Sequence, residues 1–597
     1  MGHETMSFFD ELKRRNVIRV AIAYLVASWL LLQLVEVLIT ILELPGSVGK
    51  LIFLILVVGL VPVLIFSWAY EMTPEGLKRE SELGSNQPTS RYTAKKLDRV
   101  TIILLLIVAG IVMLDRFIPE STNPLEVHSG EPATLSVAID DRQSVAVMPF
   151  VNTSDDESNE YFSDGISEEL LNVLVRIQSL RVPSRTSSFT FKGSDKKLSE
   201  IGRELGVEHV LEGSVRKAGN RIRVTAQLID VHTDTHIWSE TYTREIDDIF
   251  SVQEEIAQSI VVALRLTLSG VDQERMALNS TSNVDAYNEY LLGRHFWNKR
   301  TAQSLRTAVE HLTSAVELDA NFDQAWAALA DTYVMFPEYQ AGTIEESIPL
   351  AREAVNKSLA INPDSARALA ASGYLKANYD YDWKGANADF ERAVSLEPSY
   401  ATARQWYAET LNQQRRSEEA LVQLAAARIA DPLSAVVRHV PGYVLLWSSR
   451  FDEAEVHYMD ALELGGQPIR WTVHNLDMLN TMRGDYDEAR RRARQLAQME
   501  GFDPAADLAR IDAVENPALQ ERALLLLAER QDIGDGVFGK ALQLALLGEY
   551  ELALDSLEKA FVAGDPYAAS MYYMNVYEPL HDEPRFQAML KEMNLQP

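Results

Sequence analysis

Three stretches in the last half of the chain decide its fold: ANADFERAVSLEP (residues 386–398), ALVQLAAARIADP (420–432) and AEVHYMDALELGG (454–466). Each begins with an alanine and repeats it seven residues later, with a bulky apolar residue between the two, and the first two stretches close on a proline. The spacing from one stretch to the next is 34 residues. Small residues at this spacing let two helices of a hairpin approach closely. The repeat predicts a stacked array of helical hairpins.

We expect this array to fill residues 283–597. Asn283–Leu318 reads as a degenerate first hairpin, and Trp326–Tyr333 as the first helix of the next unit. About nine extra residues around Pro337–Ile344 predict a loop inserted into that unit. A short helix around Phe586–Leu590 is expected to cap the exposed end of the stack.

Composition excludes several classes of function. The chain has 597 residues, a formal charge of -30 and no cysteine. An acidic surface repels phosphate backbones, so we expect no nucleic-acid partner. The missing thiols exclude disulfides, thiolate zinc sites and cysteine nucleophiles. The metalloprotease, serine-hydrolase and phosphate-loop signatures are also absent. We therefore expect no enzyme activity, no catalytic residues, no cofactor and no metal site.

Apolar stretches near the start predict a membrane anchor over residues 1–118. Val17–Leu42, Leu51–Tyr70 and Val100–Ile118 are each near the length that spans a bilayer. Lysines and arginines collect before the first stretch and between the second and third, which places both segments in the cytoplasm. Three transmembrane helices would then carry the large acidic region into the periplasm of a bacterial inner-membrane protein. If the third stretch does not cross, that region faces the cytoplasm instead.

A polar linker over residues 119–142 separates the anchor from a domain predicted at residues 143–270. Its pattern changes to short apolar runs that alternate with amphipathic helices, which is typical of an α/β fold. We expect strands at Ser144–Phe150, His209–Arg216, Arg221–Asp230 and Thr235–Tyr242, with a two-residue turn at Gly219-Asn220. Helices are expected around Ile166–Ile177, at Leu198–Leu205 and from Ile249 to about Leu268. His232 and His236 bracket Asp234, but we favour a hairpin loop there over a metal site.

Several motifs of this domain resemble the TolB-like, or FlgO-type, domain of bacterial envelope proteins. They are VMPF (147–150), YFSDG (161–165), RTSS (185–188), VLEGSVRKAGNRIRVTAQLID (210–230), IWSETY (237–242) and DIF (248–250). Residues 7–38 and 69–80 likewise resemble the anchor of membrane-bound tetratricopeptide proteins that carry this domain. The resemblance implies three parts: transmembrane helices, a TolB-like α/β domain and an all-α tetratricopeptide superhelix. Similar proteins are sometimes fused to class III nucleotide cyclases, but no stretch here is left for a cyclase domain of ordinary size.

Two sets of residues are candidates for binding. In tetratricopeptide proteins the first helix of each unit lines a concave groove, which implies a partner-binding set. The set is Asp331, Arg367, Tyr374, Asn378, Gln405, Glu409, Asn412, His439, Tyr443 and Trp447. The alternative for the aromatic members is packing between repeats. The second set, Arg185, Thr186, Ser187 and Ser188, follows a strand and either presents polar groups to a ligand or forms a turn that satisfies its own backbone.

The sequence thus favours a noncatalytic scaffold that binds protein or peptide partners through the groove, next to the bilayer. One alternative is an enzyme-associated sensor or regulator, related to nucleotide-cyclase signalling, that binds a small molecule in the α/β domain. The other is the same scaffold facing the cytoplasm. Partner identity and oligomeric state do not follow from the sequence.

Overall fold

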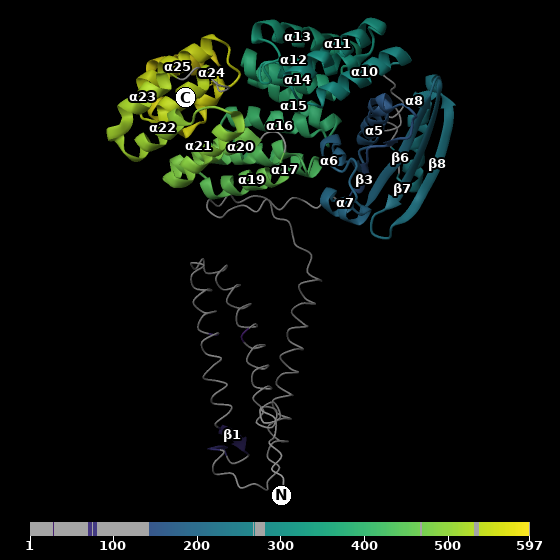
Figure 1. Ribbon diagram of the computed structural model, residues 1–597, viewed down its shortest axis with the longest axis horizontal. Coiled ribbons are helices and arrows are strands. Elements are labelled where there is room, and N and C mark those ends of the chain that lie inside the picture. The colour runs from purple at the N-terminus through teal and green to yellow at the C-terminus, as the bar shows by residue number, and fades with distance from the viewer. Residues whose placement is uncertain are drawn as a thin grey trace. The chain divides into compact units, whose positions relative to one another are not determined.

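The computed structural model describes residues 142–266, 268, 281–465, 469–529 and 536–595, together with residues 28, 56, 70–73 and 76–79 (Figure 1). The predicted transmembrane stretches, apart from three single positions, and nearly all of the linker lie outside the described residues. None of the helices within the described ranges combines the length and apolar character needed to cross a bilayer. The chain divides into two compact units, residues 1–130 and 131–597. In the first, β1 (Tyr70–Thr73) and β2 (Gly76–Arg79) form an antiparallel pair.

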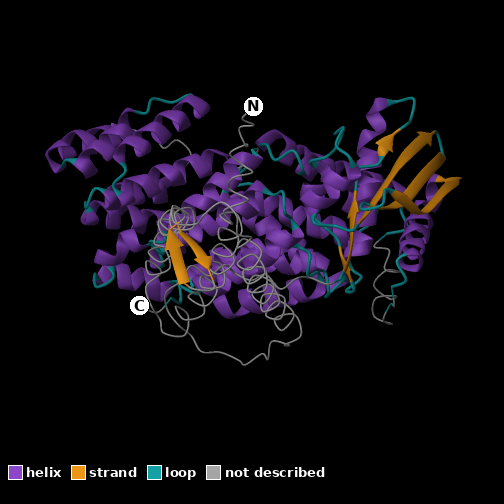
Figure 2. Ribbon diagram, turned by 90° about the horizontal axis from the view of Figure 1, so that it is seen from below, coloured by secondary structure: helices purple, strands orange, loops and turns teal. Residues whose placement is uncertain are grey.

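The α/β domain is built on one mixed sheet, which Figure 2 shows beside the helices of the second unit. Its strand order is β5-β3-β6-β7-β8, and β4 pairs with β6. The strands are β3 (Gln143–Val147), β4 (Val151–Asn152), β5 (Leu180–Arg181), β6 (His209–Ala218), β7 (Arg221–Asp230) and β8 (Thr235–Glu245). Strand β3 runs parallel to both neighbours, whereas β6, β7 and β8 are antiparallel. The predicted strands form, and the one expected at Ser144–Phe150 ends earlier, at Val147.

Helices cover both faces of this sheet. On one face α5 (Glu160–Val175) and α8 (Ile249–Ala263) pack their apolar side chains against Val145, Val147 and Val224. On the other face α7 (Leu198–Leu205) packs Ile201 and Leu205 against Ala146 and Val210. Buried residues of β3 and β6 therefore serve two separate cores, whereas those of β7 serve the first. Helix α8 stops at Ala263, short of the predicted Leu268.

Both hairpin turns of the sheet use residues that suit them. Gly219 adopts φ +58° between the paired residues Ala218 and Arg221, a conformation that favours glycine. At the next turn, Asp230 Oδ1 accepts hydrogen bonds from the backbone N–H groups of His232 and Thr233, each at 2.9 Å. The segment that carries His232 and His236 is thus the predicted hairpin loop.

Paired helices form the rest of the second unit, and each pair is one hairpin of a tetratricopeptide-like array. The first helices are α10 (Val284–Trp297), α12 (Asp323–Met335), α14 (Ala366–Leu375), α16 (Ala401–Gln413), α18 (Ala435–Trp447), α20 (Ile469–Arg483), α22 (Ala505–Glu515) and α24 (Gly536–Leu546). Their partners are α11 (Ala302–Leu318), α13 (Ile344–Ile361), α15 (Trp383–Leu396), α17 (Ser417–Ala430), α19 (Phe451–Leu464), α21 (Tyr486–Glu500), α23 (Gln520–Glu529) and α25 (Tyr550–Val562).

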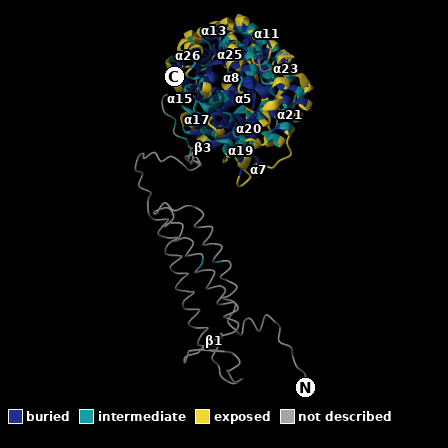
Figure 3. Cartoon of the chain, turned by 90° about the vertical axis from the view of Figure 1, so that its left-hand side faces the viewer, coloured by how far each residue is buried: buried dark blue, intermediate teal, exposed yellow. Residues whose placement is uncertain are grey.

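The repeated small and bulky residues pack where the sequence predicts. Ala386, Phe390 and Ala393 on α15 are completely buried, and their counterparts on α17 and α19 are at most 1 % exposed. Across these hairpins a glycine faces the bulky residue: a Cβ on Gly442 would lie 2.7 Å from Tyr458, and one on Gly373 would lie 2.8 Å from Phe390. Close approach of the paired helices therefore explains the 34-residue pattern. Figure 3 shows such buried positions in dark blue within the helical layers.

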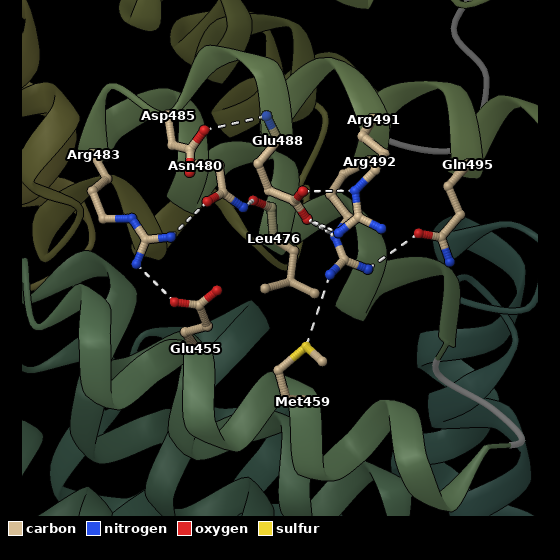
Figure 4. Close-up of polar contacts among 10 residues, drawn as sticks. All are labelled: Glu455, Met459, Leu476, Asn480, Arg483, Asp485, Glu488, Arg491, Arg492 and Gln495. Carbon is tan, nitrogen blue, oxygen red and sulfur yellow. Dashed lines mark hydrogen bonds and ion pairs between the residues drawn. The ribbon is translucent and has the colours of Figure 1, made fainter.

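Ion pairs join neighbouring hairpins at their polar surfaces, as Figure 4 shows for α19, α20 and α21. Arg483 Nη1 lies 2.7 Å from Glu455 Oε2 on the preceding hairpin, and Arg492 Nε lies 2.7 Å from Glu488 Oε1 within α21. The second guanidinium also lies 3.8 Å from the Met459 sulfur of α19. Pairs of this kind are individually weak, so they help to fix the alignment of the stack more than its stability.

The C-terminal segment does more than cap the last hairpin. It contains η6 (Ala568–Tyr572), η7 (Asn575–Leu580) and α26 (Pro584–Glu592), and α26 packs against α25. Beyond α26, the Met593 carbonyl accepts a 2.7 Å hydrogen bond from Trp383 Nε1 of α15, and Asn594 donates to the Tyr381 carbonyl. The prediction of a cap at the end of the stack is therefore incomplete, because the chain end also contacts hairpins from the middle of the array.

Candidate functional site

The ten predicted groove residues, which we call the inner face, lie on first helices of the array or, for Asn378, just after α14, and half of them are buried. The buried members are Asp331, Asn378, Asn412, His439 and Trp447, which are between 1 % and 8 % exposed. Arg367, Tyr374, Gln405, Glu409 and Tyr443 are partly exposed. The expectation that all ten face solvent is wrong for the five buried residues, because neighbouring first helices pack over them. For Trp447, packing within the array is the correct alternative.

Polar contacts between consecutive first helices account for most of the buried members. Arg367 Nη1 on α14 lies 3.0 Å from Asp331 Oδ2 on α12. Gln413 on α16 donates a 3.0 Å hydrogen bond to Asn378 Oδ1, which follows α14. His439 Nδ1 on α18 lies 2.9 Å from Thr472 Oγ1 on α20. Burial lowers the pKa of His439 to about 4, so the ring is neutral at physiological pH. These residues hold the hairpins in register.

Gln405 and Glu409 are partly exposed members of the inner face. Gln405 Nε2 donates a 3.0 Å hydrogen bond to Glu409 Oε1 one turn away. Burial raises the pKa of Glu409 to about 7, and the nearby carboxylate of Glu338 adds to this shift. Glu338 is exposed and lies in the segment inserted between α12 and α13. The spacing of the repeats predicts this insertion, but it does not reveal that Glu338 lies close enough to affect Glu409.

The C-terminal segment covers the other side of this face. The rings of Tyr443 and Tyr573 lie 6.3 Å apart in an edge-to-face arrangement. Arg415 Nε donates a 2.8 Å hydrogen bond to the Tyr572 carbonyl, and Asn575 Nδ2 donates to Ser449 Oγ at 2.6 Å. The chain therefore fills part of its own groove around Tyr443. Arg367, Gln405 and Glu409 remain partly exposed.

A buried ion-pair cluster attaches the α/β domain to the first hairpin. Glu168 on α5 lies 2.8 Å from Arg294 Nη2 on α10 and 2.9 Å from Arg185 Nε. Burial alone would raise the pKa of Glu168, but the guanidinium groups of Arg294 and Arg185 lower it to about 2. Beside the cluster, a Cβ on Gly165 would lie 2.7 Å from Leu291 of α10. Helices α5 and α10 are thus in direct contact through a charged, tightly packed interface.

The four residues proposed as a ligand loop form part of the same interface. Arg185–Phe189 is a short helix, α6, capped by Ser184. The Ser187 hydroxyl donates to Asp431 of the array and accepts a 2.9 Å hydrogen bond from the Leu433 N–H, while Ser188 is fully buried. Arg185 binds Glu168 and stacks on Phe189 at 3.8 Å, and Thr186 alone is exposed. These residues form neither a turn nor an open loop. They form a short helix that contacts the array.

The described residues of the two domains show no cluster suited to a metal ion. Within the part of the chain that the structure describes, no group of three or more His, Asp or Glu side chains is placed to share one ion. Sequence patterns do not reveal contacts between residues that lie far apart in the chain, such as those of Glu168 with Arg294 and of Ser187 with Asp431. No spacing in the sequence reveals such pairs.

Comparison with known proteins gives partial relatives. No family model matches the chain. Over 220 residues it is 37 % identical to "Putative adenylate cyclase 3" of Rhizobium meliloti (strain 1021), which covers 36 % of this chain and 38 % of that protein. Over 310 residues it is 21 % identical to the transcriptional regulator HilA of Salmonella typhimurium, which covers 51 % of this chain and 55 % of the regulator. The chain thus spans about two fifths and about half the length of these relatives.

Among solved structures, the chain is similar to PilF of Pseudomonas aeruginosa, with 19 % identity and a TM-score of 0.30. That match covers 38 % of this chain and 97 % of PilF. A tetratricopeptide repeat protein from Parabacteroides merdae gives 18 % identity, a TM-score of 0.29, and coverage of 45 % and 99 % of the two chains. At these scores neither structure carries an argument about function. The repeat architecture rests on the helix pairs described above.

Proposed function

We propose that this chain is a noncatalytic scaffold that holds a protein or peptide partner on the inner face of its helical array. The observation that carries the proposal is that Arg367, Gln405 and Glu409 stay partly exposed on the consecutive first helices α14 and α16, beside buried neighbours that fix the register of the hairpins. Arrays of this kind present their first helices as extended binding surfaces. Polar groups held on rigid helices suit recognition, because little ordering is needed when a partner binds.

The proposal also includes the membrane anchor and the side of the membrane on which the array lies. Residues 1–118 anchor the chain in a bacterial inner membrane, and the TolB-like domain and the array lie in the periplasm. The asymmetry of the flanking lysines and arginines supports this orientation. The charge of -30 supports a protein partner over a nucleic acid.

Capture of crosslinked partners tests the scaffold function. We expect the full-length protein, crosslinked in cells, to retain a defined set of proteins. The double variant Gln405→Ala and Glu409→Ala loses that set, whereas Glu245→Gln, an exposed change on β8, keeps it. If the double variant retains the same proteins, the inner face is not the binding surface.

A fusion of alkaline phosphatase after Pro119 tests the orientation, since this enzyme is active only after export. Activity supports the periplasmic assignment. An inactive fusion, together with activity of a cytoplasmic reporter at the same position, favours the alternative in which the same scaffold faces the cytoplasm.

The second candidate is a regulator that binds a small molecule, related to nucleotide signalling. The similarity to an adenylate cyclase relative over 220 residues is the observation that favours it. Titration of the full-length protein with ATP and with cyclic AMP separates the two functions. Saturable binding supports the regulator, whereas partner capture without nucleotide binding supports the scaffold alone.

A further inference from the structure

The array opens between its last two hairpins. Among the described residues, each earlier second helix packs against the first helix of the next hairpin, whereas α23 and α24 make little contact with each other. A cleft of about 830 Å³ lies there, lined by α23, α24 and α25. These helices form the yellow, C-terminal end of the array in Figure 1. This cleft is separate from the inner-face patch on α14 and α16.

The lining of the cleft is apolar and accessible. Leu519 is 39 % exposed, Leu525 is 60 % exposed and Leu552 is 45 % exposed, and all three line the cleft. Leu544 lies deeper in it and is buried. Leucines gathered along one depression, and left open to water, are typical of a surface that a partner covers.

Unpaired cations surround these leucines. Arg522, Lys540 and Lys559 line the cleft. Their side chains have no ion-pair or hydrogen-bond partner among the described residues. The lining also holds two carboxylates, Glu521 and Asp555, and Asp555 shares Arg585 with Glu551 and Glu558. Three cations against two carboxylates give the lining of the cleft a small positive charge in a chain whose formal charge is -30.

We propose that this cleft docks an amphipathic helix with an acidic flank, supplied by a partner protein. The leucines receive the apolar stripe of that helix, as in other helix-in-groove complexes, and Arg522, Lys540 and Lys559 attract its carboxylates. None of the residues that line the cleft belongs to the inner face. This second site goes beyond the proposed function and does not depend on it.

Two synthetic peptides provide the test. Both are helices of about 18 residues, or five turns, with leucines on one face; one carries glutamates beside the leucines and the other carries lysines. We expect the full-length protein to bind the glutamate peptide, and to bind the lysine peptide at least about tenfold more weakly, measured by fluorescence anisotropy. Equal affinity for both peptides, or no binding of the glutamate peptide, overturns the proposal.

Variants locate the binding. Leu525→Glu should abolish binding of the glutamate peptide. The fold tolerates this substitution because the Leu525 side chain is exposed. Val422→Glu is the matched control, since Val422 is 54 % exposed on α17, away from the cleft. The double variant Lys540→Glu and Lys559→Glu should reverse the preference between the two peptides. If Val422→Glu weakens binding as much as Leu525→Glu, the binding is nonspecific and the proposal fails.

Two further results separate this site from other occupants and from the inner face. Gln405→Ala should leave peptide binding unchanged, so failure of the scaffold function and failure of this proposal are distinguishable. In sedimentation experiments the native protein and Leu525→Glu should have the same oligomeric state. If Leu525→Glu dissociates an oligomer, a second copy of the chain fills the cleft and the acidic-helix proposal is wrong.

Discussion

Glu168 is the side chain on which attachment of the α/β domain most depends. It is 5 % exposed and holds two guanidinium groups. Removing its charge leaves Arg294 buried without a counter-ion, so Glu168→Gln should lower the free energy of unfolding by about 3–5 kcal/mol. Chemical denaturation of the full-length chain measures this. Glu204→Gln, which breaks the exposed pair with Lys196, is the control and should cost less than about 1 kcal/mol.

Glu168 should also account for part of the loss of folding stability at acid pH. Its pKa is about 2 in the folded protein against an ordinary value of 4.5. The stabilisation is therefore complete above pH 4.5 and is lost as the pH falls towards 2. Melting temperatures across this range should fall more steeply for the native chain than for Glu168→Gln. Parallel curves would contradict the assigned ion pairs.

Glu409 should affect stability in the opposite direction. Its folded pKa is about 7 against an ordinary 4.5, so the folded state retains a proton that the unfolded state releases. Stability from this group is present below pH 4.5 and is lost as the pH rises through about 7. Glu409→Gln should reduce the fall in melting temperature between about pH 5 and about pH 8. An unchanged fall, with Glu245→Gln as reference, would show that Glu409 is fully solvated.

At the scale of residues, the sequence identifies a helix face but not what covers it. The spacing of the first-helix positions selects Arg367, Gln405 and Glu409, which are partly exposed. The same spacing selects Asn378 and His439, which the adjacent hairpins bury. Whether a polar residue meets solvent or a neighbouring helix depends on the tilt between hairpins, which periodicity along one helix does not contain.

At the scale of elements, a strong hydrophobic periodicity in the sequence is sufficient to predict a helix or a strand. The short helix at Leu198–Leu205, the hairpin around Gly219 and the repeat helices all form as predicted. Helix α6 was not predicted, because five residues rich in serine lack a helical pattern and are stabilised by Asp431 of the array. Tertiary contacts decide such short elements.

Close packing of α18 on α19 gives a prediction at this scale. In an open helix Gly→Ala stabilises by about 0.5–1 kcal/mol. At Gly442 the added Cβ would lie 2.7 Å from the Tyr458 ring, so Gly442→Ala should instead destabilise the chain, by about 1–3 kcal/mol. Urea denaturation measures the sign. Ser448→Ala, an exposed change just after the same helix, should alter stability by less than about 1 kcal/mol.

At the scale of the whole second unit, the α/β domain and the array should unfold together. Gly165 on α5 has no room for a side chain beside Leu291 of α10. Gly165→Val should therefore separate the two domains and split one calorimetric transition into two. Gly219→Asn is the control, since its turn has nothing within 4 Å of the added Cβ and asparagine tolerates positive φ. A single unchanged transition for Gly165→Val would contradict the docking.

Site-specific photo-crosslinking in living cells tests the central claim most directly. A photoreactive amino acid replaces Gln405 on the inner face, and in a second strain it replaces Val422 on the outer surface of α17. The scaffold function predicts a discrete crosslinked partner from position 405 that is absent from position 422. Identical products from both positions, or none from position 405, would contradict a partner held on the inner face.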